Sequence, residues 1–98
     1  MPKKENQFQA ELIDELENRY KGCIVMKNDP NYIQGIPDLT ILHNSKWAAL
    51  EVKKSQSEKH QPNQDDYVDQ MNGMSFASFI YPENKSAVLS KLDTFFGI

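Results

Sequence analysis

The stretch GIPDLTIL at residues 35–42, followed by WAALEVK at residues 47–53, decides the fold. Both runs are apolar enough to form buried strands, and the four polar residues between them suit a hairpin turn. Side chains alternate along a strand, so Glu51 and Lys53 should point to the same face. Pairing as a hairpin would bring the far ends of the two strands together and place Asp38 beside them. A carboxylate pair with an adjacent ammonium suits a divalent cation and a water held for attack on phosphate.

Length and composition set the class of protein. The chain has 98 residues, of which 39% are hydrophobic and 26% charged, and these values predict one soluble domain over residues 1–98. No apolar run approaches the roughly 20 residues that span a bilayer, and the N-terminus lacks the apolar stretch of a secretory signal. We therefore expect no membrane association. A cytoplasmic, intracellular location is expected.

Charge and cysteine content exclude several kinds of site. The net charge of −3 argues against tight nonspecific binding of nucleic acid by the whole surface, but not against a local basic footprint. The single cysteine, Cys23, excludes a disulfide framework and a zinc site built on several cysteines, and we interpret it as a small strand residue. His43 and His60 lie in no metal-binding pattern, and His60 stands alone in a polar loop. No glycine-rich phosphate loop occurs, so no small-molecule cofactor is expected.

Periodicity and turn residues predict the order helix, three strands, helix, strand, helix. The expected elements are a helix over 5–20, strands over 23–27, 39–42 and 47–53, a helix with Pro62 in its first turn that ends at Gly73, a strand over 75–81, and a last helix opened by residues 82–84. The first three strands should form an antiparallel meander. The crossover helix should return the fourth strand alongside them, which gives a mixed four-stranded sheet.

Two further polar side chains fall on inward helix faces. On a helical wheel, Glu5 lies in the middle of the apolar arc of the first helix. It is either a first-turn acid favoured by the helix dipole or a third carboxylate aimed at the site. Gln64 shares the inward face of the second helix with Val68 and Met71. It could cap neighbouring backbone groups, or it could reach a phosphate or a metal-bound water.

Basic residues crowd the segment that follows Lys53. Lys54, Lys59 and His60 lie there, either as a solvated loop or as contacts to phosphate. The second interpretation would make them a nucleic-acid-binding strip beside the acidic cluster.

Pro37-Asp38 followed by Glu51-Val52-Lys53 resembles the PD-(D/E)XK signature of restriction-endonuclease-like nucleases. The expected α-β-β-β-α-β order is that of the common core of this superfamily, and Glu5 and Gln64 match an acid and a glutamine found in many members. The contiguous residues 35–39 look most like the small stand-alone VRR-NUC branch. The resemblance covers residues 5–81, and the last helix has no matching motif.

This resemblance implies a Mg²⁺- or Mn²⁺-dependent DNA endonuclease. Asp38 and Glu51 would bind the metal with the main-chain carbonyl of Val52, and Glu5 would complete the site. Lys53 would orient or help to deprotonate the attacking water, and Gln64 would position water or phosphate. The products would carry a 5′-phosphate and a 3′-hydroxyl.

The expected partner is duplex or branched DNA, with selectivity for branched or junction DNA of the kind a resolvase cuts. Because the domain is small, a homodimer is predicted, with the apolar C-terminal residues as candidate interface: Phe95, Phe96 and Ile98. Two alternatives compete with the nuclease. One is a non-catalytic nucleic-acid-binding module on the same fold. The other is a structural domain in which Asp38, Glu51 and Lys53 form a coincidental ion-pair cluster.

Overall fold

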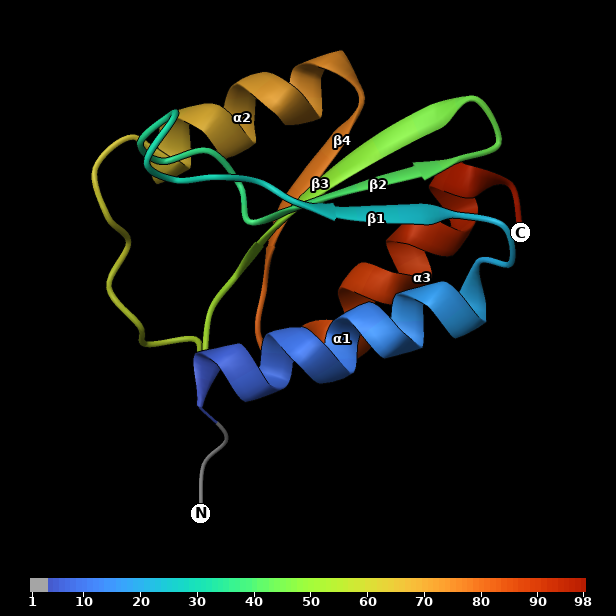
Figure 1. Cartoon of the computed structure of the whole chain (residues 1–98), viewed down its shortest axis with the longest axis horizontal. Coiled ribbons are helices and arrows are strands. Elements are labelled where there is room, and N and C mark those ends of the chain that lie inside the picture. Colours follow the sequence, from blue (N-terminus) through green and yellow to red (C-terminus); the bar gives the residue numbers. More distant parts are fainter. Residues whose placement is uncertain (1–3) are drawn as a thin grey trace.

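Helices cover both faces of a four-stranded mixed sheet in the computed structural model, which describes residues 4–98 (Figure 1). The elements are α1 (Glu5–Arg19), β1 (Ile24–Lys27), β2 (Leu39–His43), β3 (Lys46–Val52), α2 (Gln64–Met74), β4 (Phe76–Ile80) and α3 (Lys85–Phe96). The strand order is β1-β2-β3-β4, with β1, β2 and β3 antiparallel and β4 parallel to β3. The predicted order of elements, the meander and the mixed sheet are confirmed. No helix within residues 4–98 has the length and apolarity that a bilayer crossing requires.

The two ends of α2 differ from the prediction. Pro62 lies in a turn before the helix, because Asn63 adopts a left-handed φ of 73° and the helix can begin only at Gln64. At the other end, α2 continues through Gly73 to Met74. No atom lies within 4 Å of the position that a Cβ would take at Gly73. A glycine inside a helix costs only about 1 kcal/mol, so Gly73 does not end the helix.

The main core lies between the sheet and the pair α1 and α3. Because side chains alternate between the two faces of a strand, every second residue of a strand points into this core. On the sheet side the core contains Leu39, Ile41, Ala48, Leu50, Val52 and Ile80. Apolar residues of the two helices cover them: Phe8, Leu12, Leu16, Val88, Leu89, Leu92 and Phe96. Figure 1 shows α1 and α3 together on this side of the sheet and α2 on the other.

The opposite face is only partly covered, because α2 packs on β3 and β4 and leaves β1 and β2 without a helix. Ala49, Val68 and Ala77 form a small buried cluster there, with Trp47 and Phe79 packed against it. Trp47 is therefore part of this smaller core. Apolar side chains project from the uncovered strands: Ile24 is 57% exposed, Met26 42% and Leu42 37%.

The C-terminal residues offered as a dimer interface have different surroundings. Phe96 is 2% exposed and belongs to the main core, while Phe95 packs against that core with its ring 5.5 Å from the ring of Phe76. Ile98 is 69% exposed. Phe96 is thus buried in the core and is not available for a dimer contact, whereas Ile98 is exposed.

The loop before β2 is anchored on the turn that leads into α2. Gly35 has a φ of 89°, and a Cβ at this position would lie 2.7 Å from the Asn63 Cβ and 2.8 Å from the Pro62 carbonyl oxygen. At the start of β2, the Asn28 side chain donates to the carbonyl of Pro37 at 2.9 Å. These contacts bring the end of the loop, where Asp38 lies, close to the start of α2.

Replacing Gly35 by alanine should therefore destabilise the fold more than the same change at Gly22. Gly22 has a nearly equal φ of 86°, but no atom lies within 4 Å of the position its Cβ would take. Gly22→Ala should cost about 1 kcal/mol for the left-handed backbone alone. Gly35→Ala should cost about 1–3 kcal/mol more because of the clash, as measured by urea unfolding. Equal losses in the two variants would show that the close approach does not hold the loop.

Candidate active site

Three carboxylates from three different elements converge at one end of the sheet. Glu5 comes from the first turn of α1, Asp38 directly precedes β2, and Glu51 lies in β3; one oxygen of each lies within 4.8 Å of the others. The hairpin register explains the pair, because Leu39 is opposite Leu50 and the next position along carries Asp38 to Glu51. The structure thus brings the three predicted acids together, and their binding of a metal stays a prediction.

Glu51 is the central residue of this cluster. Its side chain is 3% exposed, and Oε2 accepts a hydrogen bond from Nε2 of Gln64 at 3.0 Å. Oε1 is buried and has no hydrogen-bond partner among residues 4–98. Burial, followed by the charge of Asp38, raises the pKa of Glu51 to about 8. A buried, unpartnered carboxylate oxygen is costly and calls for a ligand to explain it.

Glu5 contributes a second perturbed acid. Partial burial raises the pKa of Glu5, and the charges of Glu58 and Asp38 raise it further. The carboxylates therefore repel one another across the site. A cation between them would remove both the repulsion and the unpartnered oxygen of Glu51.

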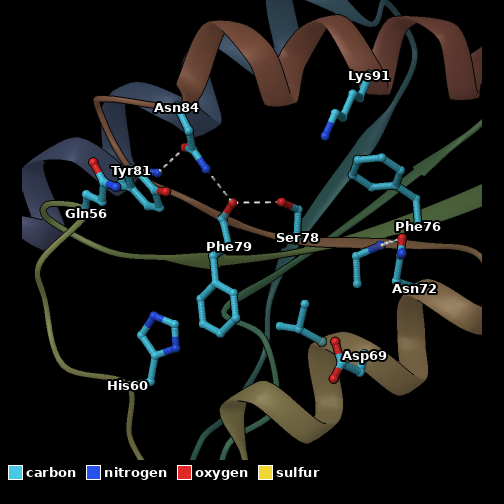
Figure 2. Close-up of a pocket in the computed structure, with 12 residues that line it drawn as sticks. Gln56, His60, Asp69, Asn72, Phe76, Ser78, Phe79, Tyr81, Asn84 and Lys91 are labelled. Atoms are coloured by element: carbon cyan, nitrogen blue, oxygen red, sulfur yellow. Dashed lines mark hydrogen bonds between the residues drawn. The ribbon is translucent and has the colours of Figure 1, made fainter.

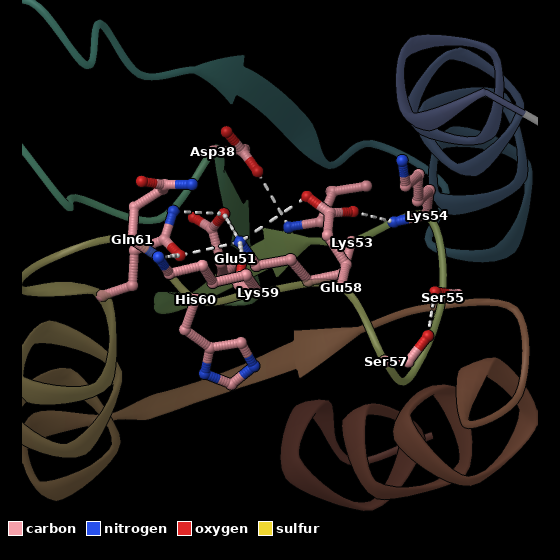
Figure 3. A network of polar contacts seen from close by, with 12 residues as sticks. Asp38, Glu51, Lys53, Lys54, Ser55, Ser57, Glu58, Lys59, His60 and Gln61 are labelled. Carbon is pink, nitrogen blue, oxygen red and sulfur yellow. Dashed lines mark hydrogen bonds and ion pairs between the residues drawn. The ribbon is translucent and has the colours of Figure 1, made fainter.

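Lys53 lies beside Glu51, as the alternation of β3 predicts. Its Nζ donates to Oε1 of Gln64 at 2.7 Å and to the carbonyl of Lys59 at 3.3 Å, and its side chain is 3% exposed. Carboxylate oxygens of Glu51 and Glu58 each lie 3.8 Å away (Figure 3). Lys53 therefore has four oxygen neighbours, each from a different residue.

Gln64 connects the acid to the lysine. Its Oε1 accepts from Lys53 and, at 2.8 Å, from the backbone amide of Gln61, while its Nε2 donates to Glu51. The predicted contact with a backbone group is confirmed at the Gln61 amide, and contact of Gln64 with a phosphate or a metal-bound water stays a prediction. Its place as the first residue of α2 explains why the turn before the helix must be held in position.

Asp38 is oriented by the backbone of β3. Its Oδ2 accepts a hydrogen bond from the amide of Val52 at 2.8 Å, which fixes the carboxylate at the end of the strand (Figure 3). The main-chain carbonyl of Val52 as a further ligand stays a prediction.

Glu58 was missed by sequence reasoning. It folds back over the site: Oε1 accepts from the backbone amide of Lys54 at 2.6 Å, and Oε2 is the oxygen near Lys53. The signal was a single acid in an otherwise neutral or basic loop. Loop geometry, however, has no periodicity from which its direction could be inferred.

The basic segment passes beside the site and contacts it through the backbone of Lys59. Lys54 and Lys59 are exposed, and the carbonyl of Lys59 touches Lys53. His60 does not stand alone, which corrects the expectation: its Nδ1 lies 2.7 Å from Oδ1 of Asp65, and its ring stacks on Phe79 with centroids 4.0 Å apart. Contact of Lys54, Lys59 and His60 with nucleic acid stays a prediction.

Two other residues of interest lie away from this cluster. His43 is at the far end of β2, where its ring contacts the rings of Tyr20 and Phe96 at 5.6 and 5.3 Å. Cys23 is half-buried beside the main core, and its Sγ lies 3.7 Å from the carbonyl of Leu16. Cys23 directly precedes β1, which begins at Ile24, so it lies one residue before the strand that was expected to include it.

The donor set fits a divalent cation. Mg²⁺ and Mn²⁺ prefer carboxylate, carbonyl and water oxygens, and three carboxylates converge here. The unpartnered oxygen of Glu51 is the observation that makes this cluster more than a group of surface acids. Lys53 adds a positive charge beside the position where a phosphate would approach.

Comparison of the chain with protein-family models, with curated proteins and with solved structures gave no match. The function is therefore inferred from the residues and their geometry.

Without metal, the stability of the protein should fall as the pH rises from about 5 to about 8. An acid whose pKa is raised from 4.5 to about 8 binds its proton more tightly in the folded chain than in the unfolded chain, so ionising it costs folding free energy over this range. Each pKa unit corresponds to about 1.4 kcal/mol. Glu51→Gln should remove most of this slope in urea unfolding with EDTA and should stabilise the protein near the upper pH.

Glu83→Gln is the matched control, because Glu83 is exposed on the turn before α3. It should keep the slope of the unchanged protein. The same slope in Glu51→Gln would mean that the buried carboxyl does not carry the pH dependence.

Proposed function

We propose that this protein is a Mg²⁺- or Mn²⁺-dependent endonuclease that hydrolyses phosphodiester bonds in DNA. The observation that carries the proposal is the buried Oε1 of Glu51, which lacks a partner where Glu5 and Asp38 converge. The neighbouring Lys53 argues against a purely structural ion pair. An ion-pair cluster built for stability would satisfy its buried oxygens, and this one leaves one of them free.

The fold supports this proposal at the level of element order. The α-β-β-β-α-β sequence, with Asp38 before the second strand and Glu51 and Lys53 at the end of the third, resembles the core of PD-(D/E)XK nucleases. The small VRR-NUC branch is the form we propose. Here α3 is an addition that buries the sheet face opposite the site.

The residues divide the chemistry between them. Asp38, Glu51 and Glu5 would hold the metal, with the carbonyl of Val52 as a further ligand, and the bound metal would supply Lewis-acid polarisation of the phosphate. Lys53, whose Nζ donates to Gln64 and to the carbonyl of Lys59, would orient or help to deprotonate the attacking water and would offset charge in the transition state. Gln64 would hold Lys53 and Glu51 in position by a hydrogen bond to each.

The DNA would approach over the basic segment. Lys54, Lys59 and His60 are exposed beside the acids and are the candidate phosphate contacts. Branched or junction DNA is the substrate that we propose.

A homodimer is part of the same proposal, because a domain of this size has little surface to hold a duplex. Exposed apolar side chains available for a contact include Ile98 and three on the uncovered strands: Ile24, Met26 and Leu42. Light scattering that gives the monomer mass of 11.3 kDa at micromolar concentration would contradict the dimer.

Cleavage should require the metal and both members of the buried pair. Plasmid and branched DNA incubated with Mg²⁺ or Mn²⁺ should be cut, and EDTA should abolish the cut. Glu51→Gln and Lys53→Met should each lower the single-turnover rate by about 100-fold or more, because each removes a charge placed for the transition state.

Lys21→Met is the matched control, since Lys21 is exposed in the turn after α1, away from the acids. It should cleave at the unchanged rate. Binding of DNA without cleavage in any metal would contradict the nuclease and leave the non-catalytic binding module.

A further inference from the structure

A groove follows the exposed edge of β4 between α2 and α3. Its volume is about 510 Å³, and its lining combines aromatic rings with polar side chains, among them His60, Phe76, Phe79, Tyr81, Asn72 and Lys91 (Figure 2). None of these residues belongs to the acid cluster. The groove is therefore a feature separate from the acid cluster.

The groove begins next to the candidate active site. Phe79 is the register partner of Glu51 across β3 and β4, so the two residues lie on neighbouring strands, roughly 5 Å apart along the sheet. His60 stacks on Phe79 and directly follows Lys59, whose carbonyl touches Lys53. A molecule bound at the acids could extend into the groove without leaving the protein surface.

The edge of β4 is blocked against an added peptide strand. The amide of Ala77 is taken by Oδ1 of Asn72 at 3.1 Å, and the carbonyl of Phe79 accepts from Nδ2 of Asn84 at 3.1 Å and from the hydroxyl of Ser78 at 2.8 Å. Oδ1 of Asn84 also accepts from the amide of Tyr81 at 2.8 Å. Strand addition needs these backbone groups free, so an extended peptide is a poor fit.

A nucleobase fits the same features well. It is flat, it stacks on aromatic rings whatever its sequence, and its edges carry both donors and acceptors. His60 and Phe79 form a parallel pair with an interplanar angle of 16°, and a base beside this pair would extend the stack. Asp69 and Lys91 offer one charge of each sign, which suits a neutral, polar ligand.

We infer that this groove is a subsite for one unpaired nucleobase next to the scissile phosphate. The inference rests on the proposed function, in that the acid cluster must bind the backbone of the same strand. A base inside a duplex is paired and stacked and cannot enter, whereas a base at a fork, flap or strand end enters at little cost. The groove would therefore direct cutting to the junction between paired and unpaired DNA.

The test compares a base with its absence at a single position. A duplex with a single-stranded extension is bound by the full chain in Ca²⁺, and an abasic residue replaces the base at successive unpaired positions. One position near the junction should weaken binding about tenfold in fluorescence anisotropy, the effect of losing one stacked base. Equal binding within about twofold at every position would overturn the subsite.

Variants assign the effect to the groove. In Phe79→Leu and His60→Ala the ratio between base and abasic DNA should fall to about twofold or less. The ratio is taken within each variant, so partial loss of folded protein affects both DNAs alike, and exposed His60 can be replaced without opening the core. Tyr32→Leu, which removes a ring that is 83% exposed outside the groove, should keep the tenfold ratio. An unchanged ratio in both groove variants would overturn the assignment.

Cleavage of the same DNAs in Mg²⁺ separates this inference from the proposed function. Cleavage without any preference for the base overturns the subsite and leaves the nuclease in place. A preference in binding without cleavage in any metal supports the subsite and contradicts the nuclease.

Discussion

The structure depends on the cost of burying Glu51 and Lys53 together. Both side chains are 3% exposed, and a charge in such surroundings must be matched by opposite charge and hydrogen bonds. Gln64 supplies the link, since one amide group donates to the acid and accepts from the lysine. The start of α2, the turn before it and the loop that carries Asp38 all have to be placed so that this bridge can form.

The remaining imbalance of charge is the reason for proposing a metal at this cluster. Three carboxylates face a single buried ammonium, and the unpartnered oxygen of Glu51 shows that the protein alone does not satisfy the cluster. Burial keeps the pKa of Glu51 high without a cation, which is a ground state of low stability near neutral pH. A divalent ion would convert this unfavourable arrangement into a favourable one. In the proposed function, the same buried carboxylate would both destabilise the metal-free fold and bind the metal, a combination that is common at active sites.

Much of the fold could be predicted because period and register are local properties of the sequence. The alternation in β3 placed Glu51 and Lys53 on one face, the hairpin placed Asp38 opposite, and the helical wheel selected Glu5. The rest depends on contacts between irregular segments. The return of Glu58 over the site, the close approach of Gly35 to Asn63 and the stacking of His60 on Phe79 all involve loops, whose paths no periodic pattern specifies.

The central claim is that Glu5, Asp38 and Glu51 form one divalent-cation site around the unpartnered oxygen of Glu51. Crystals grown with Mn²⁺ test it most directly, by anomalous scattering collected above the manganese edge. The account predicts a strong peak between the three carboxylates, about 2.2 Å from the Oε1 of Glu51. A map without a peak there, in crystals whose surface sites do bind Mn²⁺, would contradict it.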